Sequence, residues 1–493
     1  MDLLLQSLER WKPFTALVVG DFMLDELVYG DAERLSADAP VPILHVRRRE
    51  HRPGGAANVC LDLVALKGRV EAFGVIGSDE AGRHLAAALQ REHVGVAGLV
   101  QDPSRPTTRK QNLIGLAQAR HPQKMFRVDD ESREPLGPDV VRRMLERFKV
   151  ALATADVVCI EDYDKGVCTS ELCQGVIDLA RQANKPVLVD PARISDYARY
   201  RRATVITPNR TEAETATGAT THAEADVAHN AALARRLLAE VQLDAVVLTL
   251  DKHGALLLER DGTPLAVPTV ARKVYDVTGA GDMMLAALAA ARANNIGWED
   301  SVRFANAAAG LEVEVFGVEP IPLERVHHSI LEQSAALRGK VRTLDQLQVE
   351  LAARRKSGQR IVFTNGCFDL LHAGHCDLLD KAAAQGDFLV VGLNSDASVR
   401  RLKGPTRPVN NADDRARVLG ALGCVGAVVV FDQDTPQTLI EAVRPDVLVK
   451  GADYTKDKVV GGAFVESYGG RVALIDLVEG KSTTATIKKM QEP

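Results

Sequence analysis

The chain has 493 residues and lacks an excess of charge of either sign. Its 61 lysines and arginines face 66 aspartates and glutamates, which leaves a net charge of −5. This balance excludes a strongly basic module that would bind nucleic acid. Apolar residues make up 46% and charged residues 26% of the chain, a composition that excludes a disordered or fibrous protein.

Paired cysteines and long apolar runs are also missing. The seven cysteines are an odd set without a C-x-x-C pair, which indicates reduced thiols and neither a disulfide framework nor a zinc site. The longest stretch without polar side chains, 418–431, has fourteen residues and predicts a helix end, a turn and a buried strand. The first ten residues carry no basic region typical of a secretory signal. We therefore expect a cytoplasmic protein that neither binds nucleic acid nor enters a membrane.

Short β-rich runs alternate with helical patterns along the whole chain, which predicts α/β domains with parallel sheets covered on both faces. The predicted strands are 16–20, 157–162, 186–190, 245–250, 361–366, 388–394 and 446–451.

Two segments interrupt this alternation. Residues 25–60 contain two prolines that flank Val41 and a basic run, and they lack helical periodicity. We predict that they form short antiparallel strands, which act as a lid or a dimer contact. A charged segment near 335–345 precedes a fresh first strand at 361–366. We therefore predict two domains, 1–335 and 341–493, each of ordinary size.

The first candidate active site lies in VYDVTGAGDMM, at the start of a strongly helical stretch. Gly279, Ala280 and Gly281 allow backbone amides to crowd together at a helix N-terminus, where they can bind a transferring phosphoryl group. Asp282 follows in the same turn, and its carboxylate can accept the proton of an attacking hydroxyl. The alternative is a glycine-rich turn whose aspartate only caps the helix.

Further polar residues follow other predicted strands or open other helices, where ligands bind in open parallel sheets. Asn209 and Glu212 are three residues apart and could orient a hydrated magnesium ion through water. The other candidates are Asp21, Asp25, Gly54, Gly55, Asn58, Thr249 and Gly254.

These elements occur in the order typical of one family. The first 325 or so residues resemble the ribokinase or PfkB family of sugar kinases, which implies a ribokinase-like doubly wound sheet with a small β lid. The resemblance implies that Asp282 is the general base and that Gly279–Gly281 bind the γ-phosphate. It also implies that Asp21, Asp25, Gly54, Gly55 and Asn58 bind the sugar. Finally, it implies that Asn209, Arg210, Thr211, Glu212, Thr249, Gly254 and Asn306 serve ATP and Mg²⁺, with Glu212 at the metal.

Three segments narrow the implied substrate: 34–44, 125–131 and 161–166 resemble the heptose-phosphate branch of that family. A phosphorylated sugar needs a cation at its far end. Arg127 and Lys165 are the candidates, and the alternative for such basic residues is a solvated face.

The second candidate active site lies in VFTNGCFDLLHAGHC, at 362–376. His372 and His375 are three residues apart on one helix face, near its start. There they can neutralise the charge that builds up as pyrophosphate leaves an α-phosphorus. A zinc pair and two unrelated surface histidines are the alternatives.

The surrounding segments favour a nucleotide site. Residues 341–493 resemble the cytidylyltransferase-like nucleotidyltransferases, which implies a Rossmann-like domain. The residues that the resemblance assigns to the nucleotide are Thr364, Asn365, Gly366, Phe368, Lys403, Arg415, Lys450, Ser482, Thr483 and Thr484. Leu477 and Val478 stand where several relatives that use glycerol phosphate have an arginine, which favours adenylyl over cytidylyl transfer.

Together the two halves resemble fused heptose-phosphate kinases and adenylyltransferases. The resemblance implies phosphorylation of D-glycero-β-D-manno-heptose 7-phosphate at O1 by ATP. It also implies AMP transfer to the 1-phosphate, which gives ADP-heptose for lipopolysaccharide core synthesis. We expect sugar phosphates and ATP as the small-molecule partners, and a homodimer formed through the 25–60 lid. The alternatives are a kinase for another sugar phosphate fused to a different transferase, such as a cytidylyltransferase, and a sugar-sensing regulator on an inactive kinase fold.

Overall fold

The computed structural model describes residues 3–116, 122–220, 226–269, 278–315, 318–333, 339–356, 358–452 and 455–476. The chain divides into two compact units, Gln6–Val326 and a second one that joins Met1–Leu5 to His327–Pro493. The division falls inside α10 (Leu323–Gln333), a few residues before the predicted linker. None of the helices in the described parts of the chain is long and apolar enough to cross a membrane.

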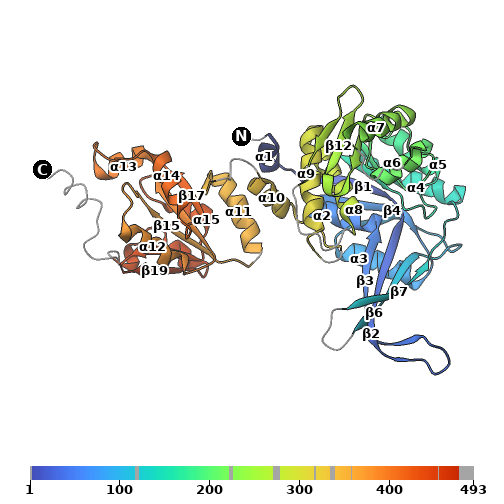
Figure 1. The fold of residues 1–493 in the computed structure, drawn as a ribbon, viewed down its shortest axis with the longest axis horizontal. Helices are drawn as coiled ribbons and strands as arrows, with labels where there is room; N and C mark the ends of the chain where they lie inside the picture. Colours follow the sequence, from blue (N-terminus) through green and yellow to red (C-terminus); the bar gives the residue numbers. More distant parts are fainter. Residues whose placement is uncertain are drawn as a thin grey trace. The chain divides into compact units, whose positions relative to one another are not determined.

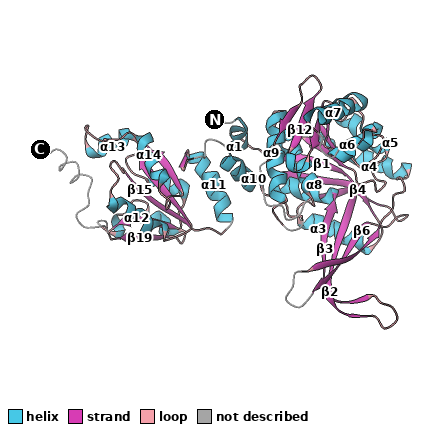
Figure 2. Ribbon diagram, viewed as in Figure 1, coloured by secondary structure: helices cyan, strands magenta, loops and turns pink. Residues whose placement is uncertain are grey.

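The first unit is built on a twisted sheet in the order β13-β12-β11-β10-β9-β8-β1-β4-β5 (Figures 1 and 2). In this spatial order the strands from β11 across to β5 run parallel to one another. β12 and β13 are added antiparallel at the β11 edge. Their bounds are β1 Phe14–Gly20, β4 Gly68–Ile76, β5 Gly95–Gln101, β8 Val157–Glu161, β9 Val187–Asp190, β10 Val205–Ile206, β11 Ala245–Thr249, β12 Ala255–Glu259 and β13 Leu265–Val267. The predicted parallel sheet is confirmed.

Helices cover both faces of this sheet, as the near-continuous apolar strands require. On one face α4, α5, α6 and α7 share a core with the strands, and on the other α2, α8 and α9 pack together. The helices are α1 Leu3–Glu9, α2 Ala56–Ala65, α3 Glu80–Arg91, α4 Pro138–Ala151, α5 Ser170–Gln182, α6 Arg210–Thr217, α7 Val227–Val241, α8 Ala280–Ala293 and α9 Trp298–Glu312, with 3₁₀ turns at Leu152–Thr154, Ala198–Tyr200 and Asp251–His253.

A second sheet projects from the first as a lid, in the order β3-β2-β6-β7 (Figure 1). Its strands are β2 Phe22–Leu35, β3 Pro42–Gly55, β6 Thr108–Leu116 and β7 Gln123–Asp130. The antiparallel β2–β3 pair was predicted, but each strand has 14 residues and is longer than expected. β6 and β7 were missed because they lie 50 or more residues further along the chain.

The second unit contains a six-stranded parallel sheet in the order β14-β17-β16-β15-β18-β19. The predicted turn in 418–431 is confirmed, since α14 ends at Ala421 and β17 begins at Ala427. The elements are β14 Val341–Arg342, α11 Leu344–Lys356, β15 Ile361–Gly366, α12 Ala373–Ala383, β16 Phe388–Asn394, α13 Asp396–Lys403, α14 Ala412–Ala421, β17 Ala427–Phe431, α15 Gln437–Val443, β18 Val447–Gly451, a 3₁₀ turn Lys456–Lys458, α16 Gly462–Ser467 and β19 Arg471–Ile475.

The start of this unit is held together by the buried carboxylate of Glu350 on α11. Arg342 of β14 and Arg354 of α11 contact it at 3.0 and 2.7 Å, and His328 of α10 lies 3.9 Å away. Although burial opposes the charge, these partners hold the pKa of Glu350 down to about 2. The network ties α10 and β14 to α11, within the second unit.

We predict that Glu350→Gln lowers the free energy of unfolding of the second unit by about 2–4 kcal/mol, because it leaves buried guanidinium groups without their anion. The contribution of a group with a lowered pKa is complete above its unfolded value and is lost as the pH falls towards 2. Denaturant titrations at pH 7 and pH 3 should therefore show a smaller difference between wild type and variant at pH 3. Glu441→Gln, a change at an exposed acid on α15, should alter stability by less than about 0.5 kcal/mol.

Candidate active sites

Asp282 lies in the first turn of α8, at the carboxyl edge of the first sheet. Gly279 precedes the helix with a φ of 91°, a conformation that favours glycine, and a Cβ there would stand 2.5 Å from Oε1 of Glu312. The helix thus begins with small residues, and its N-terminal amides and dipole favour an anion. The structure brings the predicted phosphoryl site and the predicted base into one turn.

Both oxygens of the Asp282 carboxylate accept hydrogen bonds. Nδ2 of Asn58, on α2, donates to Oδ2 at 2.9 Å, and the hydroxyl of Tyr163 donates to Oδ1 at 2.7 Å. Burial raises the pKa of Asp282 to about 6, although the two hydrogen bonds lower it. A carboxylate with this pKa is largely ionised near pH 7 and is basic enough to accept a hydroxyl proton.

Two further acids, Glu161 and Asp190, converge on Asp282. One carboxylate oxygen from each of the three lies within 4.8 Å of the others. Burial and the charge of Asp190 raise the pKa of Glu161 well above its usual range. Burial and the charge of Glu212 do the same for Asp190. Such a cluster of carboxylates suits a hydrated divalent cation or stored protons.

The predicted sugar-binding residues gather at the base of the lid. Burial raises the pKa of Asp25 on β2. The positive charges of Lys110, Arg127 and Lys124 lower this pKa, but by less. A Cβ on Gly54 would stand 2.5 Å from Oδ2 of Asp25, so glycine is required for this approach.

Asp21 and Lys165 have close contacts within the protein. Asp21 accepts hydrogen bonds from the backbone amides of Tyr163, Lys165 and Val167 at 2.8–3.3 Å. Its burial raises its pKa to about 6. Nζ of Lys165 lies 2.6 Å from Glu131. Sugar binding by these two residues stays a prediction.

The predicted nucleotide residues of this unit follow β10 and β11. Asn209 and Glu212 form a capping box at the start of α6, with hydrogen bonds of 2.8 and 2.9 Å, and Asn209 pairs with Thr249. Arg210 and Thr211 occupy the first turn of that helix, and Gly254 has a φ of 88°. Asn306 donates to the carbonyl of Val267 at 2.9 Å and so braces the end of β13.

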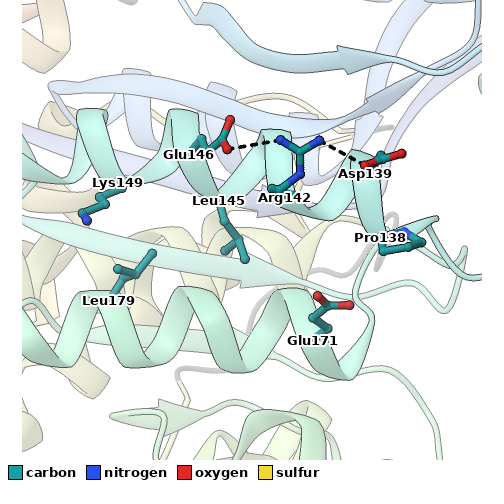
Figure 3. A pocket seen from close by; sticks show the side chains of 8 residues that line it. All are labelled: Pro138, Asp139, Arg142, Leu145, Glu146, Lys149, Glu171 and Leu179. Carbon is teal, nitrogen blue, oxygen red and sulfur yellow. Dashed lines mark hydrogen bonds and ion pairs between the residues drawn. The ribbon is translucent and has the colours of Figure 1, made fainter.

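A surface hollow between α4 and α5 lies elsewhere in this unit (Figure 3). Arg142 lies over it and pairs with Asp139 at 3.0 Å and Glu146 at 3.4 Å. Its lining includes none of the residues discussed above.

The second site gathers at the carboxyl end of β15 and the start of α12. His372 is the N-cap of α12, and its ring stacks on that of His375 with centroids 3.8 Å apart. Phe368, at a φ of 44°, places its ring edge-on to His375 at 5.2 Å. Burial lowers the pKa of His375 to about 4, and the charge of His372 lowers it further, so His375 is a neutral ring near pH 7. The neutral ring can therefore donate a hydrogen bond without carrying a positive charge.

Other predicted residues of the second site have intramolecular partners. Lys450 of β18 donates to Oδ1 of Asn365 at 2.6 Å, and the Thr364 hydroxyl donates to the Val449 carbonyl at 3.1 Å. Arg415 is buried and donates to the carbonyls of Cys367 and Asn410 and to Asp396. Gly366 ends β15, Lys403 is exposed at the end of α13, and Ser482, Thr483 and Thr484 lie outside the described residues.

Sequence reasoning missed several of these groups. Tyr163, Glu161 and Asp190 were not predicted to be site residues, although segment 161–166 was noted and 186–190 was predicted as a strand. An acid at the carboxyl end of a strand in a parallel sheet is the signal that could have found Glu161 and Asp190. Lys110 could not be found, because the lid strand that carries it was not predicted.

The folds and sites define a sugar kinase joined to a nucleotidyltransferase. Residues 15–324 match the pfkB family of carbohydrate kinases, and residues 363–486 match the cytidylyltransferase-like family. The kinase fold is shared by phosphofructokinase-2 from Escherichia coli in complex with potassium, with a TM-score of 0.53 and 20% identity. That match covers 65% of this chain and 99% of the other.

Curated proteins match over both units. "Bifunctional protein HldE" of Geobacter sulfurreducens is 47% identical, over 96% of this chain and 95% of that protein. The protein of the same name from Rhodopseudomonas palustris is 42% identical, over 100% and 99%. The chain therefore belongs to the bifunctional HldE family of the pfkB kinases, and it is an enzyme with a kinase and a nucleotidyltransferase domain that uses ATP.

We predict that the His375 ring of the free protein titrates near pH 4 and that His372→Ala raises this pKa, because the variant removes a neighbouring charge and opens the ring to solvent. Histidine-selective NMR titration measures both values. His84→Ala, a change at an exposed histidine of α3, should leave the His375 titration unchanged, and a His375 pKa near 6.5 in the wild type would contradict the prediction.

Proposed function

We propose that the first unit phosphorylates D-glycero-β-D-manno-heptose 7-phosphate at O1, and that the second transfers AMP from ATP to the 1-phosphate and yields ADP-heptose. The observation that carries this proposal is the near-full-length match to proteins named bifunctional HldE, with both units in the same order. The resemblance of 34–44, 125–131 and 161–166 to the heptose branch supports the choice of sugar. ATP as the phosphoryl and adenylyl donor agrees with a cytoplasmic location.

In the kinase step, Asp282 accepts the proton of the O1 hydroxyl as the oxygen attacks the γ-phosphorus and ADP leaves. The amides of Gly279–Gly281 stabilise the charge on the transferring group. Asp25 and Asn58 would bind hydroxyls, while Arg127, which pairs with Asp129 at 2.8 Å in the free protein, would pair with the distal phosphate.

The acids of the first site fit a hydrated Mg²⁺. Glu212 and its neighbour Asp190, with Glu161 close by, offer the carboxylate oxygens that would hold it once they lose their protons. The ion would neutralise phosphate charge. Asn209, Thr249 and Asn306 order the segments around the nucleotide.

In the second unit, we propose that His372 and His375 donate hydrogen bonds to the phosphates of ATP. Lys403 and Lys450 would add positive charge, and Ser482–Thr484 would bind phosphate oxygens. His375 is neutral in the free protein, so its stabilisation of the phosphates grows as their negative charge approaches the ring.

We also propose that the lid joins two copies of the chain in a homodimer. Phe126 of β7 is 68% exposed and Leu35 of β2 is 63% exposed, and Val41 and Val46 add apolar surface on the same hairpin. Large apolar side chains exposed on a sheet favour association.

We predict that Asp282→Asn lowers kinase turnover by about 10²–10⁴-fold, because an amide cannot take the hydroxyl proton. Initial rates with heptose 7-phosphate and ATP measure this, and AMP transfer in the same preparation should stay normal. Asp178→Asn, at a half-exposed acid on α5, is the matched control and should leave both rates unchanged. Faster turnover of another sugar phosphate would contradict the heptose assignment, and a normal kinase rate in Asp282→Asn would contradict the general base.

We predict that ATP is strongly preferred over CTP in the second reaction, and that His375→Ala lowers adenylyl transfer by about 10²–10³-fold, as for loss of one oxyanion donor. Rates with ATP and CTP on heptose 1-phosphate test both statements, with His84→Ala as the control. Metal analysis of the purified protein should find no stoichiometric zinc. A preference for CTP, or stoichiometric zinc, would contradict this part and leave the kinase assignment standing.

A further inference from the structure

Tyr163 links the substrate end of the kinase site to its base. It follows β8 in the loop that leads to α5, and its hydroxyl donates to Oδ1 of Asp282 at 2.7 Å. The residues that make this contact are 119 positions apart in the chain. Tyr163 lies in segment 161–166, which resembles the heptose-phosphate branch, but no role was predicted for its side chain.

The position of Tyr163 is fixed from two sides. Its backbone amide donates to Oδ2 of Asp21 at 2.8 Å, and the amides of Lys165 and Val167 donate to the same carboxylate. Nζ of Lys110, on lid strand β6, lies 5.3 Å from the centre of the Tyr163 ring, within the range of a cation–π contact. The loop backbone and the lid therefore both act on the phenol.

The carboxylate that Tyr163 contacts lies among other acids. The charge of Asp25 on β2 raises the pKa of Asp282, and the charge of Lys110 lowers it. The charge of Asp282 in turn raises the pKa values of Asp62, Glu161 and Asp190. Asn58 holds the second oxygen from the α2 side. With a donor on each oxygen, the carboxylate cannot rotate freely, and each oxygen keeps a lone pair for the sugar hydroxyl.

We propose that Tyr163 is a positioning residue of the kinase, which holds the Asp282 carboxylate oriented towards the attacking hydroxyl. This inference rests on the proposed role of Asp282 as the general base. Without the phenol, Oδ1 of Asp282 loses its donor and the carboxylate is held on the Asn58 side alone, so it can turn away from the attacking hydroxyl. Asp21 supports this role indirectly, because it accepts hydrogen bonds from the backbone of the loop that carries Tyr163.

The direction of the effect on pH follows from the hydrogen bond. A donor to an ionised carboxylate lowers its pKa, so loss of the phenol should raise the pKa of Asp282 above about 6. Burial and the charge of Asp282 raise the pKa of Tyr163 itself well above its usual range, so the phenol keeps its proton at every working pH. The acid limb of kcat/KM, which reports the free enzyme, should therefore move to higher pH.

The test is the pH profile of kcat/KM for the kinase step in full-length Tyr163→Phe, from pH 5 to pH 9. We expect the acid limb to move up by about one pH unit, with a loss of roughly tenfold at pH 6 and a smaller loss at pH 8.5. A purely structural role of the hydroxyl would lower the rate equally at every pH. An unshifted acid limb would therefore overturn the proposal.

Tyr197→Phe is the matched control. Tyr197 is buried in the same unit, and its hydroxyl has no hydrogen-bond partner among the described residues. Its profile should overlay that of the wild type. Adenylyl transfer, measured in the same preparations, checks that each variant chain is folded.

A second substitution covers the case in which the Phe variant does not fold. Incorporation of 3-fluorotyrosine at position 163 keeps the shape and makes the phenol a stronger donor, so the acid limb should move to lower pH. A limb that does not move, or that moves up, would overturn the proposal. Asp282→Asn tests the general base separately from the role of Tyr163. If Asp282→Asn stays active, the assignment of the general base is wrong. If it is inactive while both Tyr163 substitutions leave the acid limb unmoved, only the role of Tyr163 is wrong.

Discussion

Burial of several carboxylates at the carboxyl edge of one parallel sheet is the constraint on which the kinase half depends. Asp21, Glu161 and Asp282 are almost excluded from water and Asp190 is partly so, and each charge there must be met by a donor, a cation or a proton. The donors come from distant segments, since backbone amides of 163–167 serve Asp21, and Asn58 and Tyr163 serve Asp282. The positions of the loop after β8, of α2 and of α8 are therefore coupled through these acids.

The second unit meets a different electrostatic requirement at the same kind of sheet edge. Here two stacked imidazoles stand at a helix start, and the nearby acid Asp369 already pairs with Arg407 and with the amides of Val409 and Asn410. Burial keeps His375 neutral in the free protein, so this ring adds no positive charge to the site before a ligand binds. Negative phosphates raise the pKa of a nearby imidazole, which makes the site most cationic when the leaving pyrophosphate needs it.

Much of this could be predicted from the sequence, because local patterns carry it. The alternation of strands and helices gave both parallel sheets, and G-A-G-D and H-x-G-H placed Asp282 and the histidines at helix starts. The lid was only half predicted, since β6 pairs with β2 across 85 residues and β7 pairs in turn with β6, and no local pattern encodes the long-range pairing. Tyr163 and Lys110 were missed for the same reason: the hydrogen bond of Tyr163 to Asp282 and the approach of Lys110 to the Tyr163 ring depend on tertiary structure.

Both halves use in-line displacement at phosphorus, yet they treat protons in opposite ways. The kinase must remove a proton from a sugar hydroxyl, and burial raises the pKa of Asp282 towards the working pH, which suits this carboxylate to the proposed role of base. In the adenylyl step the attacking group is a phosphate that is already ionised, so no base is needed and donors suffice. The acid cluster in one unit and the neutral histidine in the other therefore follow from the acceptor that each half receives: an alcohol in the first and an anion in the second.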